Sequence, residues 1–226
     1  MITWNAYDES TYKSKRYDIL YWVEETGHPS RMPYIDSAKE QYPTMGIGFN
    51  LTVRRNMNEI LKEMGFNVSA GGKEGEYVEN IRKAIDARNL EELNTIMNDW
   101  ANDDTVTTHN GKDKRDTFRL EYDEINNVFN AIAPYYEGLV DAWIAKYALN
   151  VERYSRERAV LFSLAYNSKD KNKDGIPDLL GKGLAKAFGG TVDGVKYDDN
   201  RAEAWYEIRY NSNYGDVKGI AKRRYF

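Results

Sequence analysis

The feature that most restricts the fold of this chain is one change in its hydrophobic pattern near residue 50. From Tyr34 to Phe49 the sequence is rich in β-forming residues and is interrupted by proline and glycine, which predicts a short β-hairpin or small sheet. After Asn50, apolar residues recur at helical intervals almost to the end of the chain. The pattern therefore predicts a mostly helical α+β fold with a small β-containing lobe and a larger helical lobe.

The expected helices have start and stop signals of their own. Asn89, with Glu92 three residues later, forms a capping box before one helix. Pro134 is expected to split another, because proline lacks the N–H that a helix interior requires. The expected helices span residues 17–25, 56–64, 76–87, 90–100, 121–148 (in two parts), 156–166, 179–188, 201–210 and 217–224.

Length and composition limit the classes of protein that fit. A chain of 226 residues fits a single domain, with the β-containing lobe over about 14–65 and the helical lobe over about 66–226. The absence of cysteine excludes disulfides, thiol catalysis and thiolate metal sites. A net charge of −4 argues against nucleic acid as a partner. With no apolar run of about 18 residues, no stable membrane insertion is expected.

Acidic and hydroxyl side chains gather between residues 23 and 51. Two adjacent glutamates end an apolar helical stretch, and Asp36 and Thr44 follow on the expected hairpin. A glycosidase needs one protonated carboxyl as acid and a second group that handles water. A half-buried glutamate suits the first role, since burial raises a carboxyl pKa. An aspartate and a threonine suit the second role. An acid near a helix end is usually a solvated surface group, so spacing alone does not assign these roles.

Two motifs in this stretch occur in a known order. Tyr34-Ile35-Asp36-Ser37 is followed by Thr44-Met45-Gly46-Ile47-Gly48, and the stretch resembles the active-site segment of phage-type lysozymes. The resemblance continues near the other end of the chain, in the segments Ser163–Asn167, Ala204–Tyr210 and Gly219–Arg224. Residues 66–130 contribute little to it. The chain departs from the family's pattern in longer loops before Tyr34 and before Thr44, and in lacking the glycine that commonly follows the acid.

This resemblance implies a lysozyme-like fold and hydrolysis of the β-1,4 bond between N-acetylmuramic acid and N-acetylglucosamine in bacterial peptidoglycan. The glutamate would act as general acid, while Asp36 and Thr44 would position water, with inversion and without a cofactor for catalysis. Tyr34 is expected to contact the substrate. Arg209 is expected either to contact a muramyl carboxylate or to form an ion pair on a helix surface.

Two residues compete for the role of acid. Glu24 fits the helical phase of the family's pattern without a gap and shares a helical stripe with Tyr17 and Tyr21. Glu25 needs a shift of one residue but shortens the insertion before Tyr34. We prefer Glu24 and keep Glu25 as the alternative.

A second motif predicts a structural calcium ion. The loop over residues 170–178 has the oxygen donors and the glycine of the first part of an EF-hand loop, but no glutamate at position twelve. The alternative is a polar turn between helices. The expected ligands are Asp170, Asn172, Asp174, Ile176 through its carbonyl, and Asp178.

Two other functions stay open. A catalytically inactive lysozyme-like module would bind glycan or a partner, and a lytic transglycosylase would use one glutamate and form an anhydro sugar. No signal peptide is visible at the N-terminus, so we expect synthesis in the cytoplasm and action in the periplasm or on the cell wall. That fits a phage endolysin or an antibacterial effector. The protein is expected to be a monomer, with an immunity or delivery protein as a further partner.

Overall fold

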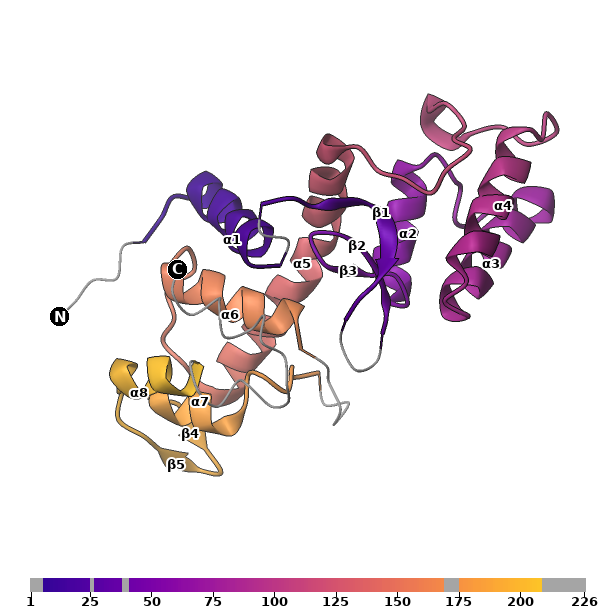
Figure 1. The fold of residues 1–226 in the computed structure, drawn as a ribbon. Helices are drawn as coiled ribbons and strands as arrows, with labels where there is room; N and C mark the ends of the chain where they lie inside the picture. Colours follow the sequence, from indigo (N-terminus) through magenta and orange to yellow (C-terminus); the bar gives the residue numbers. More distant parts are fainter. Residues whose placement is uncertain (1–5, 25–26, 38–40, 169–174, 209–226) are drawn as a thin grey trace. The chain divides into compact units, whose positions relative to one another are not determined.

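A computed structural model of the chain describes residues 6–24, 27–37, 41–168 and 175–208 (Figure 1). These described residues contain eight α-helices, one three-stranded antiparallel sheet and one two-stranded sheet. The predicted fold class, α+β and mostly helical, is confirmed. The expected helix over residues 217–224 lies outside the described residues.

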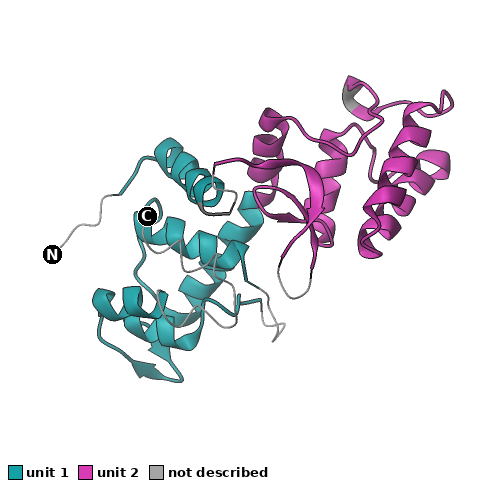
Figure 2. Ribbon diagram, in the orientation of Figure 1, with its two compact units in different colours: residues 1–26, 133–226 teal, residues 27–132 magenta. Residues whose placement is uncertain are grey.

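The chain divides into two compact units, shown in different colours in Figure 2. Unit 1 combines Met1–Thr26 with Ala133–Phe226, and unit 2 is the continuous stretch Gly27–Ile132. Unit 2 therefore contains the three-stranded sheet together with several helices. The sequence-based lobes over 14–65 and 66–226 stay a prediction.

Unit 2 begins with the sheet predicted from the β-rich stretch. Its strands β1 (Ser30–Ile35), β2 (Pro43–Gly46) and β3 (Phe49–Asn50) pair antiparallel in that order. The turn between β2 and β3 requires glycine at Gly46, which has a φ of +64°. A Cβ atom there would lie 2.4 Å from the ring of Phe49, a side chain that is fully buried.

Helices enclose the rest of the unit 2 core. They are α2 (Arg54–Glu63), α3 (Gly72–Asp86), α4 (Leu90–Ala101), the short 3-10 helix η1 (His109–Gly111) and the first part of α5 (Tyr122–Tyr147). The predicted cap of α4 is confirmed, since Asn89 Oδ1 accepts a 3.0 Å hydrogen bond from the backbone N–H of Glu92. Phe66 and Trp100 stack with ring centroids 4.0 Å apart and are fully buried. The aromatic pair anchors the end of α4 against the core.

Unit 1 has its own apolar core. It contains α1 (Glu9–Glu24), the second part of α5, α6 (Arg156–Tyr166), α7 (Lys182–Ala187) and α8 (Arg201–Tyr206), with the hairpin of β4 (Thr191–Val192) and β5 (Val195–Lys196). Trp143, Leu161 and Leu180 are fully buried in this core. The predicted bounds of α6 agree with the structure.

An ionic cluster built around two buried arginines joins α1, α5 and α6. Glu137 Oε1 accepts hydrogen bonds from the Tyr12 hydroxyl at 2.6 Å and from Arg16 at 2.8 Å. Glu137 Oε2 accepts a hydrogen bond from Arg158 Nε at 3.0 Å. Another nitrogen of the same Arg158 guanidinium donates to Asp141 at 2.7 Å. Burial and the adjacent Glu137 carboxylate raise the pKa of the Tyr12 hydroxyl. Residues far apart in sequence therefore hold unit 1 together.

The predicted break of the helix at Pro134 is wrong, because α5 is continuous from Tyr122 to Tyr147. Proline removes one backbone donor, but Phe129 and Ile132 before it and Val140 and Trp143 after it are all fully buried. Burial of apolar surface on both sides offsets the lost hydrogen bond. Packing therefore overrides the local preference at this position.

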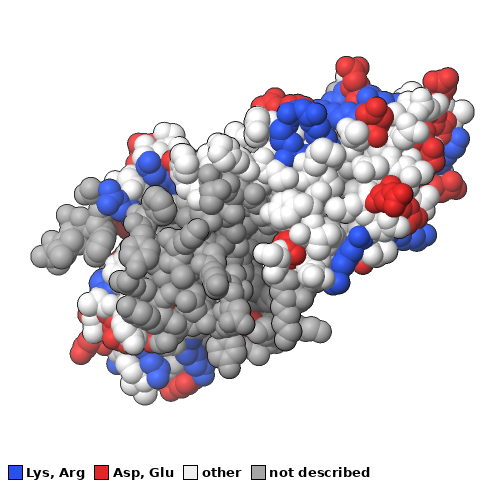
Figure 3. Space-filling view, viewed as in Figure 1, with Lys and Arg blue, Asp and Glu red and all other residues white. Residues whose placement is uncertain are grey.

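The surface of the described residues carries both signs of charge. On the face of unit 2 visible in Figure 3, acidic and basic side chains lie among uncharged ones and are not separated by sign. In the part of the chain that the structure describes, no helix is long and apolar enough to cross a lipid bilayer.

Candidate functional site

Two predicted site residues are brought together on the β1–β2 hairpin. The backbone N–H of Asp36 donates to the Tyr42 carbonyl at 3.0 Å, and Asp36 Oδ1 accepts from the Tyr42 N–H at 3.1 Å. Thr44 Oγ1 in turn donates to the Tyr42 carbonyl at 3.1 Å. Asp36 is half-buried, whereas Thr44 is only 6% exposed. The backbone of Tyr42 thus positions both side chains.

Tyr34 belongs to the same face of this hairpin. It lies directly opposite Thr44 in the register of β1 and β2, and directly opposed residues point to the same side of a sheet. Asp36 follows Tyr34 by two residues, which is the repeat of one strand face. The register therefore assigns an aromatic side chain, a carboxylate and a hydroxyl to one face.

The predicted acid is not described at the side-chain level. Glu24 is the last residue of α1 and belongs to unit 1, whereas the hairpin belongs to unit 2. The Glu24 side chain lies outside the described residues, and so do Glu25 and Arg209. Their predicted roles therefore stay predictions.

Part of the predicted calcium loop is described. Asp170, Asn172 and Asp174 lie outside the described residues, whereas Ile176 is buried and Asp178 is half-buried. Where the structure describes the chain, it contains no group of three or more His, Cys, Asp and Glu side chains arranged to hold a metal.

The described end of this loop shares one backbone feature with an EF-hand loop. Gly175 has a φ of +78°, the left-handed conformation that the glycine at position six of an EF-hand loop provides. The Leu179 N–H donates to Ser168 Oγ at 2.9 Å and joins the two ends of the loop. The carboxylate, amide and carbonyl oxygens of residues 170–178 are the donors that would hold calcium, where the ion would supply structural stability. Calcium binding stays a prediction.

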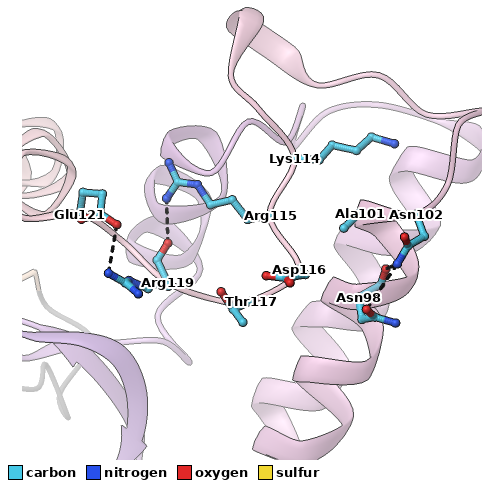
Figure 4. A pocket seen from close by; sticks show the side chains of 9 residues that line it. All are labelled: Asn98, Ala101, Asn102, Lys114, Arg115, Asp116, Thr117, Arg119 and Glu121. Atoms are coloured by element: carbon cyan, nitrogen blue, oxygen red, sulfur yellow. Dashed lines mark hydrogen bonds and ion pairs between the residues drawn. The ribbon is translucent and has the colours of Figure 1, made fainter.

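Unit 2 also contains a polar pocket with a volume of about 650 Å³ (Figure 4). Such a volume is in the range of pockets for small ligands. One wall is the C-terminal end of α4, and the other is the segment before α5. The lining residues are Asn98 and Ala101 on α4, its C-cap residue Asn102, and Lys114, Arg115, Asp116, Thr117, Arg119 and Glu121 on the segment. Because all but Ala101 are polar or charged, this lining suits a ligand that forms hydrogen bonds.

A buried carboxylate fixes the second wall of this pocket. Glu124, 6% exposed, accepts hydrogen bonds from Arg115 at 2.7 Å and Lys112 at 3.1 Å. Arg115 also donates to the Arg119 carbonyl at 2.8 Å, which fixes the turn between them. Burial alone would raise the pKa of the Glu124 carboxyl, but the hydrogen bonds from Arg115 and Lys112 outweigh it and lower that pKa.

Sequence reasoning did not find this pocket. The signal was present as a stretch of mixed charges from Lys112 to Arg119, but such a stretch is ordinarily a solvated surface. Only the fold shows that α4 lies against the stretch and makes it one wall of a cavity. Comparison of the chain with protein-family models, with curated proteins and with solved structures finds no match.

Proposed function

We propose that this protein is a muramidase with a lysozyme-like α+β fold. Its substrate is bacterial peptidoglycan, and the bond cleaved is the β-1,4 linkage between N-acetylmuramic acid and N-acetylglucosamine. The resemblance of the segment around Tyr34–Gly48 to phage-type lysozymes supports the proposal. The placement of Asp36 and Thr44 on one hairpin face supports it independently.

The proposed reaction requires two groups that act on opposite faces of the sugar. Glu24 donates its proton to the glycosidic oxygen as the bond from that oxygen to the anomeric carbon breaks. A water molecule attacks the anomeric carbon from the other face, and Asp36 accepts its proton. The products are two shorter glycan chains, with inverted configuration at the anomeric carbon.

Thr44 has a more restricted role in this proposal. Its hydroxyl proton is directed to the Tyr42 carbonyl, so towards water the oxygen acts as an acceptor. It would orient the attacking water while Asp36 removes the proton. Two hydrogen bonds carry the proposal: the Tyr42 N–H donates to Asp36 Oδ1, and the Tyr42 carbonyl accepts from Thr44 Oγ1. Together they hold a carboxylate and a hydroxyl near each other.

Clearing of purified cell walls, followed as a fall in turbidity, tests the proposal. We expect wild type to clear walls, Glu24→Gln to lose activity by at least about 100-fold, and Glu25→Gln to stay near wild type. Loss in Glu25→Gln alone would move the role of acid to Glu25. No clearing by wild type would contradict enzymatic activity and favour a binding module. Anhydro ends among the products would identify a transglycosylase.

A further inference from the structure

The pocket between the end of α4 and residues 114–121 offers charge of both signs to a ligand. Two of its five charged side chains, Arg115 and Glu121, are bound to residues outside the lining, so the other three decide what the pocket can bind. Arg115 donates hydrogen bonds to the Glu124 carboxylate and to the Arg119 carbonyl. In Figure 4 its side chain points away from Lys114, in agreement with a role in fixing the wall. The groups left to bind a ligand are therefore Lys114, Arg119 and Asp116.

Lys114 is a cation held in place by neutral groups. Its ammonium donates to the Asp103 carbonyl and lies 6.0 Å from the centroid of the Trp100 ring. Among the described residues it forms no ion pair with a carboxylate. An ammonium has three donors, and one of them is used here. Lys114 is thus positioned before any ligand arrives and keeps its charge available.

Arg119 is incompletely neutralised. Its guanidinium lies 3.4 Å from Glu121, and that carboxylate also pairs with Arg31. Arg119 Nε is buried and has no hydrogen-bond partner within the described part of the chain. The side chain as a whole is 43% exposed, and in Figure 4 its guanidinium extends toward Glu121 at the edge of the pocket. A guanidinium with spare donors favours a carboxylate.

Asp116 supplies the opposite charge at the same pocket. It is exposed and lines the cavity beside Thr117 (Figure 4). Across from it lie Asn98 on α4 and its C-cap residue Asn102, whose Nδ2 donates to Asn98 Oδ1 at 3.3 Å. The remaining donor and acceptor positions of these amides match the N–H and C=O groups of a peptide bond. The lining thus combines cations for a carboxylate, an anion for an amine, and amides for a peptide backbone.

We infer that this pocket binds a short peptide that carries both a free carboxylate and a free amino group. The peptide stems of peptidoglycan have this chemistry, and naming them as the source rests on the proposed function. Residues 66–130, which contribute little to the resemblance with lysozymes, would then recognise the peptide part of the wall while the hairpin acts on the glycan. The pocket's preference for a zwitterionic peptide does not depend on any hydrolysis.

Calorimetric titration with the synthetic tetrapeptide L-alanyl-γ-D-glutamyl-L-lysyl-D-alanine tests this inference on the full chain. We expect binding by wild type, and about tenfold weaker binding when Lys114→Gln or Arg119→Gln removes a charge-assisted hydrogen bond. Acetylation of the peptide's amino groups should weaken binding through Asp116, as should Asp116→Asn. Amidation of its carboxylates should weaken binding through the two cations. The control Lys83→Gln removes an exposed cation of α3 that does not line the pocket and should bind like wild type.

The outcomes separate this inference from the proposed function. No binding by wild type, or equal affinity in wild type, Lys114→Gln and Arg119→Gln, would overturn the peptide site. The same preparations are assayed for clearing of walls. Clearing without peptide binding overturns only the peptide site, and binding with the expected losses but without clearing overturns only the muramidase. Equal melting temperatures of the variants exclude unfolding as the cause of a lost affinity.

Discussion

Asp36 and Thr44 are joined through a single residue, because the Tyr42 N–H donates to Asp36 Oδ1 and the Tyr42 carbonyl accepts from Thr44 Oγ1, each at 3.1 Å. An amide oxygen can accept the bond from Tyr42 as a carboxylate does, but it cannot take a proton from water. We therefore predict that Asp36→Asn keeps the melting temperature of wild type and loses activity on walls by at least about 100-fold.

The matched variant Asp36→Ala separates the structural role from the chemical one. It removes the acceptor as well as the charge, so it should lower the melting temperature while activity falls as far as in Asp36→Asn. Near wild-type activity in Asp36→Asn, measured by turbidity, would show that Asp36 only holds the hairpin.

Thr44 is predicted to depend on its hydroxyl and not on its size. Thr44→Val leaves the Tyr42 carbonyl without this donor and should lower the free energy of unfolding by about 1 kcal/mol. It should also reduce activity, because water loses an acceptor. Thr44→Ser restores the hydroxyl. Recovery of wall-clearing activity in Thr44→Ser, with folding checked by denaturation, would confirm the role. A Thr44→Val protein as active as wild type would contradict it.

The cluster around Glu137 should contribute strongly to stability. Glu137→Gln removes the carboxylate that both Arg16 and Arg158 contact, and each arginine side chain is only 7% exposed. Breaking such a pair leaves buried charge, and we expect a loss of about 3 kcal/mol in urea denaturation. The control Glu9→Gln breaks an ion pair to Lys13 whose side chains are both 56% exposed, and should change stability by less than about 1 kcal/mol. Equal effects of the two variants would contradict the assignment.

The stability of unit 2 is expected to depend on pH through Glu124. Because the folded protein lowers the pKa of this carboxyl below its ordinary 4.5, ionised Glu124 stabilises the folded state above that pH. The contribution is lost as pH falls from 4.5 through the lowered pKa. The difference in unfolding free energy between wild type and Glu124→Gln should therefore be about 3 kcal/mol at pH 7 and decrease steadily below pH 4.5. A difference independent of pH would show that the charge is not involved.

Calcium should stabilise the folded protein if the loop over residues 170–178 binds it. At a calcium concentration 100 times Kd, the stabilisation would be about 2.7 kcal/mol, which corresponds to a rise of several degrees in melting temperature. A chelator should reverse the rise, and Asp174→Asn should abolish it. Asp198→Asn, outside the loop, should retain it. A melting temperature indifferent to calcium and chelator would contradict the site.

Features with a strong local signal could be predicted from the sequence. The cap at Asn89 and the bounds of α6 follow from side chains within a few positions of each other. The placement of Asp36 and Thr44 on one hairpin could also be anticipated, because a hairpin brings residues that are near in sequence close together. Local signals of this kind do not depend on the rest of the fold.

Features that depend on distant packing could not be predicted. The strands β4 and β5 have two residues each, too few to show an alternating pattern. The continuity of α5 through Pro134 depends on burial on both sides of the proline. The first helix begins at Glu9 and not at residue 17, because Asp8 Oδ1 accepts a 2.9 Å hydrogen bond from the Thr11 N–H. Tyr12 is the one hydrophobic residue between residues 9 and 16, so this stretch shows no helical repeat of apolar positions.

The interruption of unit 1 by unit 2 in the sequence has a consequence for the order in which the protein folds. Arg16 meets Glu137 across 121 positions, so unit 1 cannot close until the ribosome has made most of the chain. Unit 2 is continuous and can fold earlier, and its own structure joins the Leu120 N–H to the Arg31 carbonyl at 2.9 Å. That bond shortens the flexible chain between α1 and the second part of α5. Each halving of loop length lowers the entropic cost of bringing the ends together by about 0.6 kcal/mol. Early folding of the inserted unit is therefore expected to lower the entropic cost of closing the unit whose sequence surrounds it.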